Sequence, residues 1–302
     1  MTSDGGGSES RGPLAEHDDQ TPASDGHASV YDKDEYYADR ARGSRLTPIL
    51  EWMLRALDRR RARDVVAKTG IKTGKVLDVG AGDGKFLHFM ERLGFDVHGT
   101  TASTRSASAA QAQFGLRLDV SEGLEGQAPK GPFDLVTYWH VLEHLEDPSR
   151  HTRLWAGLVR PSGFMAIEVP NFHSIGARLC PRSWLGGDRT HHVNPQASET
   201  ILATLRHLGF DPIQTERFSA KYSYAYLWSA LLGRLFGRQY EFDRILGILQ
   251  GPMDALRRRP LWTINALAAV AYLAPVVLIL MLYGAMTNQG EVLRIYAKRR
   301  ST

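Results

Sequence analysis

Short apolar strands alternate with amphipathic helices over most of this chain, and that alternation restricts the folds open to it. The segments KVLDVG, FDVHGT, LRLDV, FDLVTYW, FMAIEVP and DPIQTERF have strand patterns. Helical patterns separate them: KFLHFMERLG, STRSASAAQAQFG, PSRHTRLWAGLVRPSG and SETILATLRHLGF. Strand–helix–strand units form right-handed crossovers, which build a parallel sheet covered by helices on both faces. The pattern therefore predicts an α/β fold.

The regions outside this pattern divide the chain further. Residues 1–29 are rich in Gly, Ser, Asp and Pro and are expected to be a disordered tail. Residues 30–217 hold an N-terminal helix and the alternating segment. Residues 218–288 form an apolar helical insertion associated with the membrane, in which YSYAYLWSALLGRLFG is expected to be a lid, an acceptor pocket or a core helix. In residues 289–302, EVLRIYAK predicts a seventh strand before a basic end. The apolar face of the N-terminal helix is predicted to consist of Leu46, Ile49, Leu50, Met53, Leu54 and Leu57.

Bulk composition narrows the class of protein. The chain has 302 residues, of which 43% are hydrophobic and 23% charged, an ordinary balance for a globular protein. Cys180 is the only cysteine, which excludes an intrachain disulfide and fits a reducing cytosol. The N-terminus has neither the basic nor the apolar region of a secretory signal, so none is expected. The formal net charge is +4 despite an acidic N-terminal region, so the remainder is basic, which favours anionic partners or a solvated surface.

A glycine-rich loop, VLDVGAGDGKF, joins the first strand to the first helix. Gly80, Gly82 and Gly84 allow a sharp turn and a close approach of a ligand to the backbone, and the helix N-terminus offers free N–H donors. The dinucleotide fingerprint requires a third glycine where this chain has Lys85, so that pattern fails.

The observed form, Asp-x-Gly-x-Gly-x-Gly, resembles the class I S-adenosylmethionine (SAM) methyltransferases. The resemblance continues through FDLVTYWHVLEHLEDP, LVRPSGFMAIEVPN and HLGF, and it is closest to ubiquinone-biosynthesis O-methyltransferases and bacterial methyltransferases of surface-polysaccharide pathways. It implies a Rossmann-like, mostly parallel seven-stranded sheet with SAM as the cofactor. The residues that it implies at the methionine end of SAM are Asp78, Gly80, Ala81, Gly82 and Gly84.

Two further cofactor positions follow from this resemblance. The second strand of the family ends in an acid that accepts both ribose hydroxyls, and this chain has Thr101 there. A hydroxyl offers a hydrogen bond without the charge, so either SAM binds more weakly or another acid, such as Asp96, substitutes. Asp119, near the end of the third strand, matches a position that meets the adenine amino group, or it caps a loop.

His140, Glu143 and His144 follow the fourth strand at a spacing that places them on one helical face. The carboxyl ends of the strands form the ligand crevice in this fold, so these side chains are expected near the transferred methyl group. An alcohol or phenol acceptor must lose its proton to a base or to a metal-activated site. One interpretation makes His140, or a later histidine such as His192, the base. Another is structural, with the cluster pinning the loop.

A third interpretation is a divalent metal site. The spacing resembles the Glu-x-x-Glu-His site of small-RNA 3′-end methyltransferases and of some ubiquinone O-methyltransferases, in which a downstream histidine is the fourth ligand. That resemblance implies His140, Glu143, His144 and His192 as ligands, with Asp188 and His192 at the matching downstream positions. Histidine in place of the first glutamate shifts the preference from Mg²⁺ toward Zn²⁺, Mn²⁺ or Fe²⁺.

Residues 261–284, LWTINALAAVAYLAPVVLILMLYG, carry no charge and are long enough to cross a bilayer. A full crossing would place the seventh strand on the wrong side of the membrane. Pro275 is expected to break or kink the helix, and basic residues flank the stretch on both sides. The sequence favours a bent hairpin attached to the cytoplasmic face of the inner membrane. A core or oligomer-interface helix and a true span are the alternatives.

These features predict a SAM-dependent O-methyltransferase acting at the membrane surface, on a lipid-linked, quinone-like or glycan acceptor. RNA methylation is an alternative, indicated by the Glu-His cluster and by RRRAR at residues 59–63, although nucleic acid is the less favoured partner. A catalytically idle SAM-binding or scaffolding membrane protein is a further alternative, indicated by Thr101.

Overall fold

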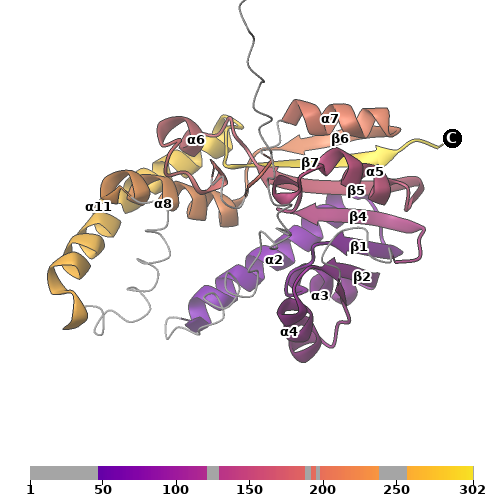
Figure 1. The fold of residues 1–302 in the computed structure, drawn as a ribbon, viewed down its shortest axis with the longest axis horizontal. Coiled ribbons are helices and arrows are strands. Elements are labelled where there is room, and N and C mark those ends of the chain that lie inside the picture. Colours follow the sequence, from indigo (N-terminus) through magenta and orange to yellow (C-terminus); the bar gives the residue numbers. More distant parts are fainter. Residues whose placement is uncertain (1–46, 121–128, 188–191, 195–197, 238–256, 302) are drawn as a thin grey trace, which may run out of the picture. The chain divides into compact units, whose positions relative to one another are not determined.

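The computed structural model describes residues 47–120, 129–187, 192–194, 198–237 and 257–301, so the tail predicted over residues 1–29 lies outside the described residues (Figure 1). Its strands form a seven-stranded sheet in the order β3-β2-β1-β4-β5-β7-β6. The strands are β1 (Lys75–Val79), β2 (Asp96–Thr101), β3 (Asp119–Val120), β4 (Phe133–Trp139), β5 (Val159–Pro170), β6 (Phe210–Glu216) and β7 (Val292–Arg299).

The sheet is parallel except at β7. Strands β3, β2, β1, β4 and β5 pair in parallel, whereas β7 runs antiparallel to both β5 and β6. Ile295 lies opposite Ile167 on β5 and Thr215 on β6. This is the Rossmann-like, mostly parallel seven-stranded arrangement that the sequence predicted.

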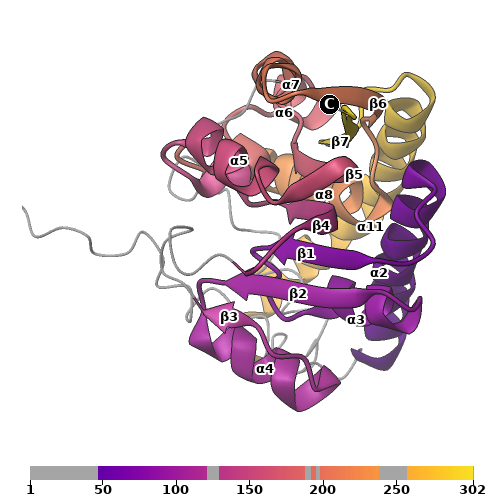
Figure 2. The ribbon, with the colours of Figure 1, turned by 90° about the vertical axis from the view of Figure 1, so that its right-hand side faces the viewer.

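Helices cover both faces of the sheet (Figure 2). Side chains of β1 alternate between the two cores, because Val76 packs with Phe86 and Met90 while Leu77 packs with Trp155 and Ile201. The first core is closed by α2 (Thr47–Thr69), α3 (Lys85–Arg92) and α4 (Thr104–Phe114), and the second by α5 (Pro148–Ala156) and α7 (Ser198–His207). The helix–sheet–helix layering is therefore confirmed.

Helix α2 ends at Thr69 before Gly70, and its predicted apolar face is only partly buried where the side chains are described, with Leu54 and Leu57 half-buried. Met53 is 40% exposed, while Ala62 and Val65 are fully buried. Two charged residues, Asp58 and Arg61, are buried beside them. The helix packs through a face that includes buried charges, which apolar periodicity does not identify.

Two predicted boundaries differ from the structure. The strand expected over Leu116–Val120 is limited to Asp119–Val120. The helix expected from Pro148 to Gly163 ends at Ala156, and Val159 already pairs with Phe133 on β4. Hydrogen bonding to the parallel strand β4 outweighs the helical pattern here, so the chain from Val159 onward joins the sheet.

The insertion contains α8 (Ala220–Phe236), which follows β6, and α11 (Pro260–Met286), which precedes β7. The two helices pack through Leu227, Trp228 and Leu232 of α8 against Ala266 and Val277 of α11. Helix α11 continues through Pro275, so the predicted break there, and a hairpin with its bend at that proline, are wrong. Pro275 has no N–H to donate to the carbonyl of Ala271. Both residues lie on the exposed side of the helix.

Candidate active site at the carboxyl ends of the central strands

Strands β1, β2, β3 and β4 run in parallel and end at one edge of the sheet. Gly80 follows β1, Thr101 ends β2, and His140 follows β4. Sequence-predicted residues from three separate segments therefore meet at this edge, where ligands bind in open α/β sheets.

The glycine loop has the backbone that its sequence predicted. Gly80, Gly82 and Gly84 all have positive φ angles, of 74°, 56° and 76°. A Cβ on Gly80 would lie 2.6 Å from Val141 Cγ2, so the loop after β4 packs directly on the first glycine. A Cβ on Gly82 would meet nothing within 4 Å. The middle of the loop is thus open to a ligand, while Ala81 N is fixed by a 2.7 Å hydrogen bond to Thr100 O.

Asp78, the residue on β1 two positions before Gly80, is almost completely buried. Its Oδ1 accepts a 2.6 Å hydrogen bond from Thr137 Oγ1 on β4. Burial raises the pKa of Asp78 to about 7, although the Thr137 hydrogen bond and the charge of Arg61 oppose that rise. Asp78 is therefore poised between its neutral and charged forms near neutral pH.

Thr101 and Asp119 lie on neighbouring strands, and their environments differ. Thr101 is buried, and its Oγ1 accepts a 3.3 Å hydrogen bond from Ser103 N, just before α4 begins. Asp119 pairs with Thr100 in the sheet and is exposed. Asp96, the alternative acid, begins β2 and so lies at the opposite end of that strand from Thr101.

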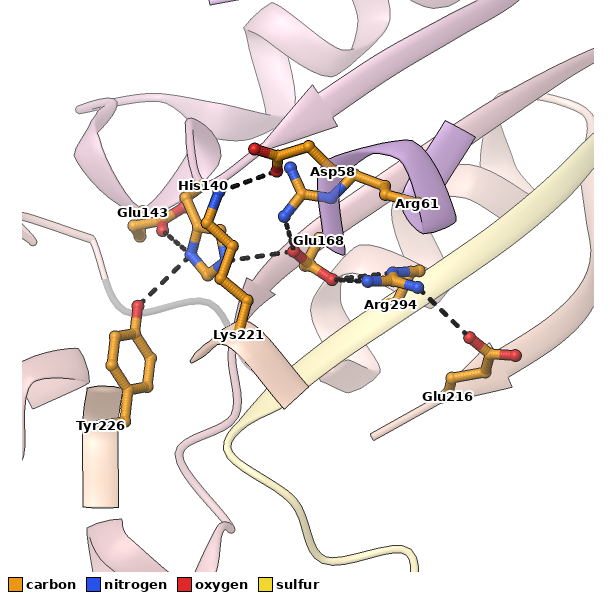
Figure 3. A network of polar contacts seen from close by, with 9 residues as sticks. All are labelled: Asp58, Arg61, His140, Glu143, Glu168, Glu216, Lys221, Tyr226 and Arg294. Carbon is orange, nitrogen blue, oxygen red and sulfur yellow. Dashed lines mark hydrogen bonds and ion pairs between the residues drawn. The ribbon is translucent and has the colours of Figure 1, made fainter. Parts of the chain in front are cut away.

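His140 sits in a left-handed backbone conformation, with φ of 57°, directly after β4. Its Nδ1 lies 3.1 Å from Glu143 Oε1 and its Nε2 lies 3.3 Å from Glu168 Oε1 (Figure 3). Burial alone would lower the pKa of His140, but Tyr222 and the two carboxylates outweigh it and raise that pKa to about 10. With a carboxylate at each ring nitrogen, the imidazole is held as a cation.

A buried ionic network extends from His140 across the sheet. Glu168 on β5 is fully buried, and it meets Arg61 of α2 at 3.3 Å and Arg294 of β7 at 2.5 Å. Burial would raise the pKa of Glu168, but Arg294 and Arg61 lower it well below its usual range. Arg294 also lies 3.6 Å from Glu216 of β6. Apolar pattern analysis missed Glu168, Arg61 and Arg294. The available signal for Glu168 and Arg294 was a charged residue inside a strand pattern, whereas Arg61 belongs to the arginine run of α2.

Helix α8 closes over the same histidine. The ring centroids of Tyr222 and His140 are 3.9 Å apart, and Tyr226 Oη lies 3.4 Å from His140 Nδ1. Burial would raise the pKa of Tyr222, but the charges of His140, Arg61 and Lys221 lower it to about 8. These two tyrosines of the insertion are site residues that the sequence placed only in a lid or acceptor pocket.

The four predicted metal ligands do not gather as one group. Glu143, His144 and His192 do, with one donor atom from each within 4.8 Å of the others, while both nitrogens of His140 face carboxylates. Glu143 lies in a short 3₁₀ helix, η1 (Leu142–His144), rather than the expected α-helix, although it still lies 3.1 Å from His140. Asp188 and His191 lie outside the described residues.

The chemistry of this three-residue group fits a divalent ion. Glu143 Oε2 is buried and has no hydrogen-bond partner among the described residues. His192 Nδ1 lies 2.8 Å from Gly186 O, an outer hydrogen bond of the kind that orients a metal-binding imidazole and leaves Nε2 free. Two histidines and one glutamate suit zinc and related transition metals.

Comparison with known proteins agrees with the fold and the glycine loop. Residues 49–215 match a family model described as "Methyltransferase domain". The ubiquinone biosynthesis O-methyltransferase of Caulobacter sp. (strain K31) is 33% identical over 116 residues, which cover 36% of this chain and 46% of that protein. The enzyme of the same name from Bordetella avium (strain 197N) is 31% identical over 157 residues, 46% of this chain and 62% of that protein. The chain spans about half the length of the curated relatives it matches.

Solved structures show the same fold. A SAM-dependent methyltransferase from Archaeoglobus fulgidus has a TM-score of 0.50 and 21% identity, covering 89% of this chain and all of the other. A putative sarcosine dimethylglycine methyltransferase from Galdieria sulphuraria has a TM-score of 0.51 and 16% identity, covering 80% and 85%. The chain belongs to the methyltransferase domain family and has the fold of the class I SAM-dependent methyltransferases.

Proposed function

We propose that this protein transfers a methyl group from SAM to a hydroxyl oxygen. The observation that carries the proposal is the loop of three left-handed glycines at the end of β1, which packs against Val141 and is open at Gly82. The curated relatives named as O-methyltransferases over this part of the chain support oxygen as the methylated atom.

In this proposal, SAM lies along the edge of the sheet. Asp78, Ala81 and the three glycines hold its methionine end, Thr101 contacts the ribose and Asp119 the adenine. Methyl transfer from a sulfonium is an in-line displacement, so much of the catalysis comes from positioning. Thr101 supplies a hydroxyl in place of a carboxylate, so we expect weaker ribose binding than an acid would give.

The acceptor is proposed to be lipid-linked, quinone-like or a membrane glycan, because α11 presents an apolar surface that suits lipid. Its mean hydropathy is 2.4 over its most apolar window, only 22% of which is buried. Exposed residues surround most of the helix, including Leu261, Tyr272, Leu278, Ile279 and Leu282. A helix that is apolar on all sides is typical of a membrane or a buried core, and α11 is not buried.

The sheet limits how such a helix enters a membrane. Glu216 of β6 pairs with Arg294 of β7, so the insertion leaves and returns at neighbouring strands. Arg257, Arg258 and Arg259 precede α11, and Lys298, Arg299 and Arg300 end β7 or follow it. We propose attachment to the cytoplasmic face of the inner membrane through residues 261–284, since both basic flanks favour that side.

The two predicted catalytic histidines have different surroundings, which bears on which group accepts the acceptor's proton. Both ring nitrogens of His140 face carboxylates, which favours its protonated form, so we assign it an electrostatic and orienting role rather than that of a base. His192 lies with Glu143 and His144 instead.

We propose a divalent-cation site made by Glu143, His144 and His192, without His140. When bound, the ion would supply Lewis acidity that lowers the pKa of an acceptor hydroxyl. Elemental analysis of the purified protein tests this: wild type should carry one equivalent of zinc, manganese or iron, and His144→Ala should lose it. Wild-type protein without metal after purification and after dialysis against these ions would exclude the site.

RNA methylation is the weaker alternative. Its main support was the run of arginines at residues 59–63, and Arg61 is buried against Glu168. Arg60 lies 3.8 Å from Asp64 on the exposed side of α2. Tight and strongly salt-dependent RNA binding would support this alternative.

The experiment that tests the proposed function uses purified protein with labelled SAM and separate lipid, glycan and RNA fractions. Label in the lipid fraction supports the proposal, and label in RNA supports the alternative. Protein that binds SAM in calorimetry but labels no fraction would instead be an idle SAM-binding protein. Failure to bind SAM would contradict the whole assignment.

A further inference from the structure

Tyr222 of the insertion helix lies against the ring of His140, and this contact carries an inference that rests on the proposed methyl transfer. Tyr222 is in the first turn of α8, and its ring centroid is 3.9 Å from that of His140. Val141, the next residue after His140, packs on Gly80 of the glycine loop. The phenol is thus joined by direct contacts to the edge of the sheet where the methyl donor is proposed to lie.

Two cationic side chains lie close to this phenol. Arg61 Cζ lies 5.4 Å from the Tyr222 ring centroid and Lys221 Nζ lies 5.6 Å from it, while the ring of His140 packs against the Tyr222 ring. Positive charge at this range favours the phenolate over the phenol. The charged and titratable groups around Tyr222 are Asp58 and Arg61 of α2, His140 and Glu143 after β4, Glu168 of β5, Arg294 of β7, and Lys221 and Tyr226 of α8.

We propose that Tyr222 accepts the proton of the acceptor hydroxyl. The acceptor oxygen bonds to the methyl carbon of SAM as the carbon–sulfur bond breaks, and that electron pair stays on sulfur, which leaves as a neutral thioether. The acceptor's proton passes to the phenolate oxygen of Tyr222, which becomes a phenol and later returns the proton to water. The step needs no further reactant.

Its neighbours are less suited to this step. Both ring nitrogens of His140 face carboxylates, so neither is directed at an acceptor. Tyr226 is 5% exposed, and its Oη is directed at His140 Nδ1 (Figure 3). Tyr222 is half-buried, so a substrate can reach it.

The test compares Tyr222→Phe with Tyr224→Phe, a matched loss of one hydroxyl from the same helix at a residue that is 44% exposed. The probe acceptor is a farnesylated catechol in phospholipid vesicles, with labelled SAM. Loss of a general base should lower kcat roughly 100- to 10,000-fold in Tyr222→Phe, with the SAM Kd and acceptor KM changed less than about threefold. In wild type and Tyr224→Phe the rate should rise with pH as Tyr222 ionises, and in Tyr222→Phe this rise should be absent.

An ultraviolet titration of tyrosinate gives a readout that needs no acceptor. Wild type should ionise one tyrosine at lower pH than the rest, and Tyr222→Phe should lack that step. A Tyr222→Phe rate within about threefold of wild type, or an unchanged titration, would overturn the inference alone. Wild-type protein that methylates neither the catechol nor any acceptor fraction would overturn the proposed function and, with it, this inference.

Discussion

Thr137 Oγ1 donates a 2.6 Å hydrogen bond to Asp78 Oδ1, joining β4 to β1 in the middle of the sheet. The pair lies under the glycine loop, and the carboxyl is only 1% exposed. Burial raises the pKa of Asp78 from 3.8 to about 7. The protein therefore holds a carboxyl group in a place that disfavours its charge.

The burial of Asp78 predicts that replacing it will increase the stability of the protein and weaken cofactor binding. Above pH 4 the unfolded chain has lost the Asp78 proton, while the folded protein keeps it until about pH 7. The folded state binds more protons in that window, so the contribution of Asp78 to stability falls as pH rises through it. Asp78→Asn should raise the Tm at pH 8 and change it little at pH 4, by thermal unfolding. The same variant should bind SAM roughly 10- to 100-fold more weakly in calorimetry, as loss of a charged hydrogen-bond partner does.

A Tm for Asp78→Asn that is lower than wild type at pH 8 would contradict the burial argument. Thr137→Val is the matched control, because it removes the hydrogen bond that stabilises the charged form. It should lower the Tm most where Asp78 is ionised.

The glycine loop predicts that two alanine substitutions will act differently. Both Gly80→Ala and Gly82→Ala place a side chain at a positive φ, at a cost of about 1–2 kcal/mol each. Gly80→Ala also sets a Cβ 2.6 Å from Val141 Cγ2, which should add roughly 1–3 kcal/mol. Gly82→Ala meets open space in the protein and should act mainly on SAM binding. Urea unfolding and calorimetry separate the two effects; equal loss of stability in both variants would refute this account.

Glu168 predicts a large stability effect from a small chemical change. Glu168→Gln removes the buried anion shared by His140, Arg61 and Arg294, leaving their charges without it. Breaking a buried ion pair from one side costs about 3–5 kcal/mol, which denaturant unfolding should show. Asp211→Asn is the control, since Asp211 pairs with Arg300 at the surface and its loss should leave the Tm unchanged. Equal effects from the two substitutions would argue against the network.

Substitutions on the exposed face of α11 are predicted to abolish membrane binding without changing the stability of the fold. Ile279 and Leu282 are 63% and 56% exposed, so a double substitution to glutamate removes no core contact. Charged residues are costly in the interior of a bilayer, so this variant should lose flotation with vesicles while keeping its Tm and SAM affinity. Ile213→Glu on β6, 45% exposed, is the control and should still float. A double variant that floats like wild type would exclude α11 as the attachment site.

Much of the fold was predictable because local pattern and tertiary role agree. The strand FDLVTYW forms β4 over Phe133–Trp139 as written, and the glycine loop adopts the left-handed angles that its spacing requires. The ionic network was not predictable in the same way. Glu168 and Arg294 are 126 positions apart, and nothing local to either indicates its partner. A charged residue inside each strand pattern marks a candidate site residue. The two meet only because β7 pairs antiparallel with β5.

The register of β7 has a consequence for how this protein can change over time. Because β6 and β7 are hydrogen-bonded neighbours, the two ends of the insertion stay roughly 5 Å apart whatever lies between them. Its length and surface can vary without shifting any strand that carries the glycine loop. Selection for a new membrane or a new acceptor can therefore act on one exchangeable segment, while the methyl-donor half of the protein is inherited unchanged.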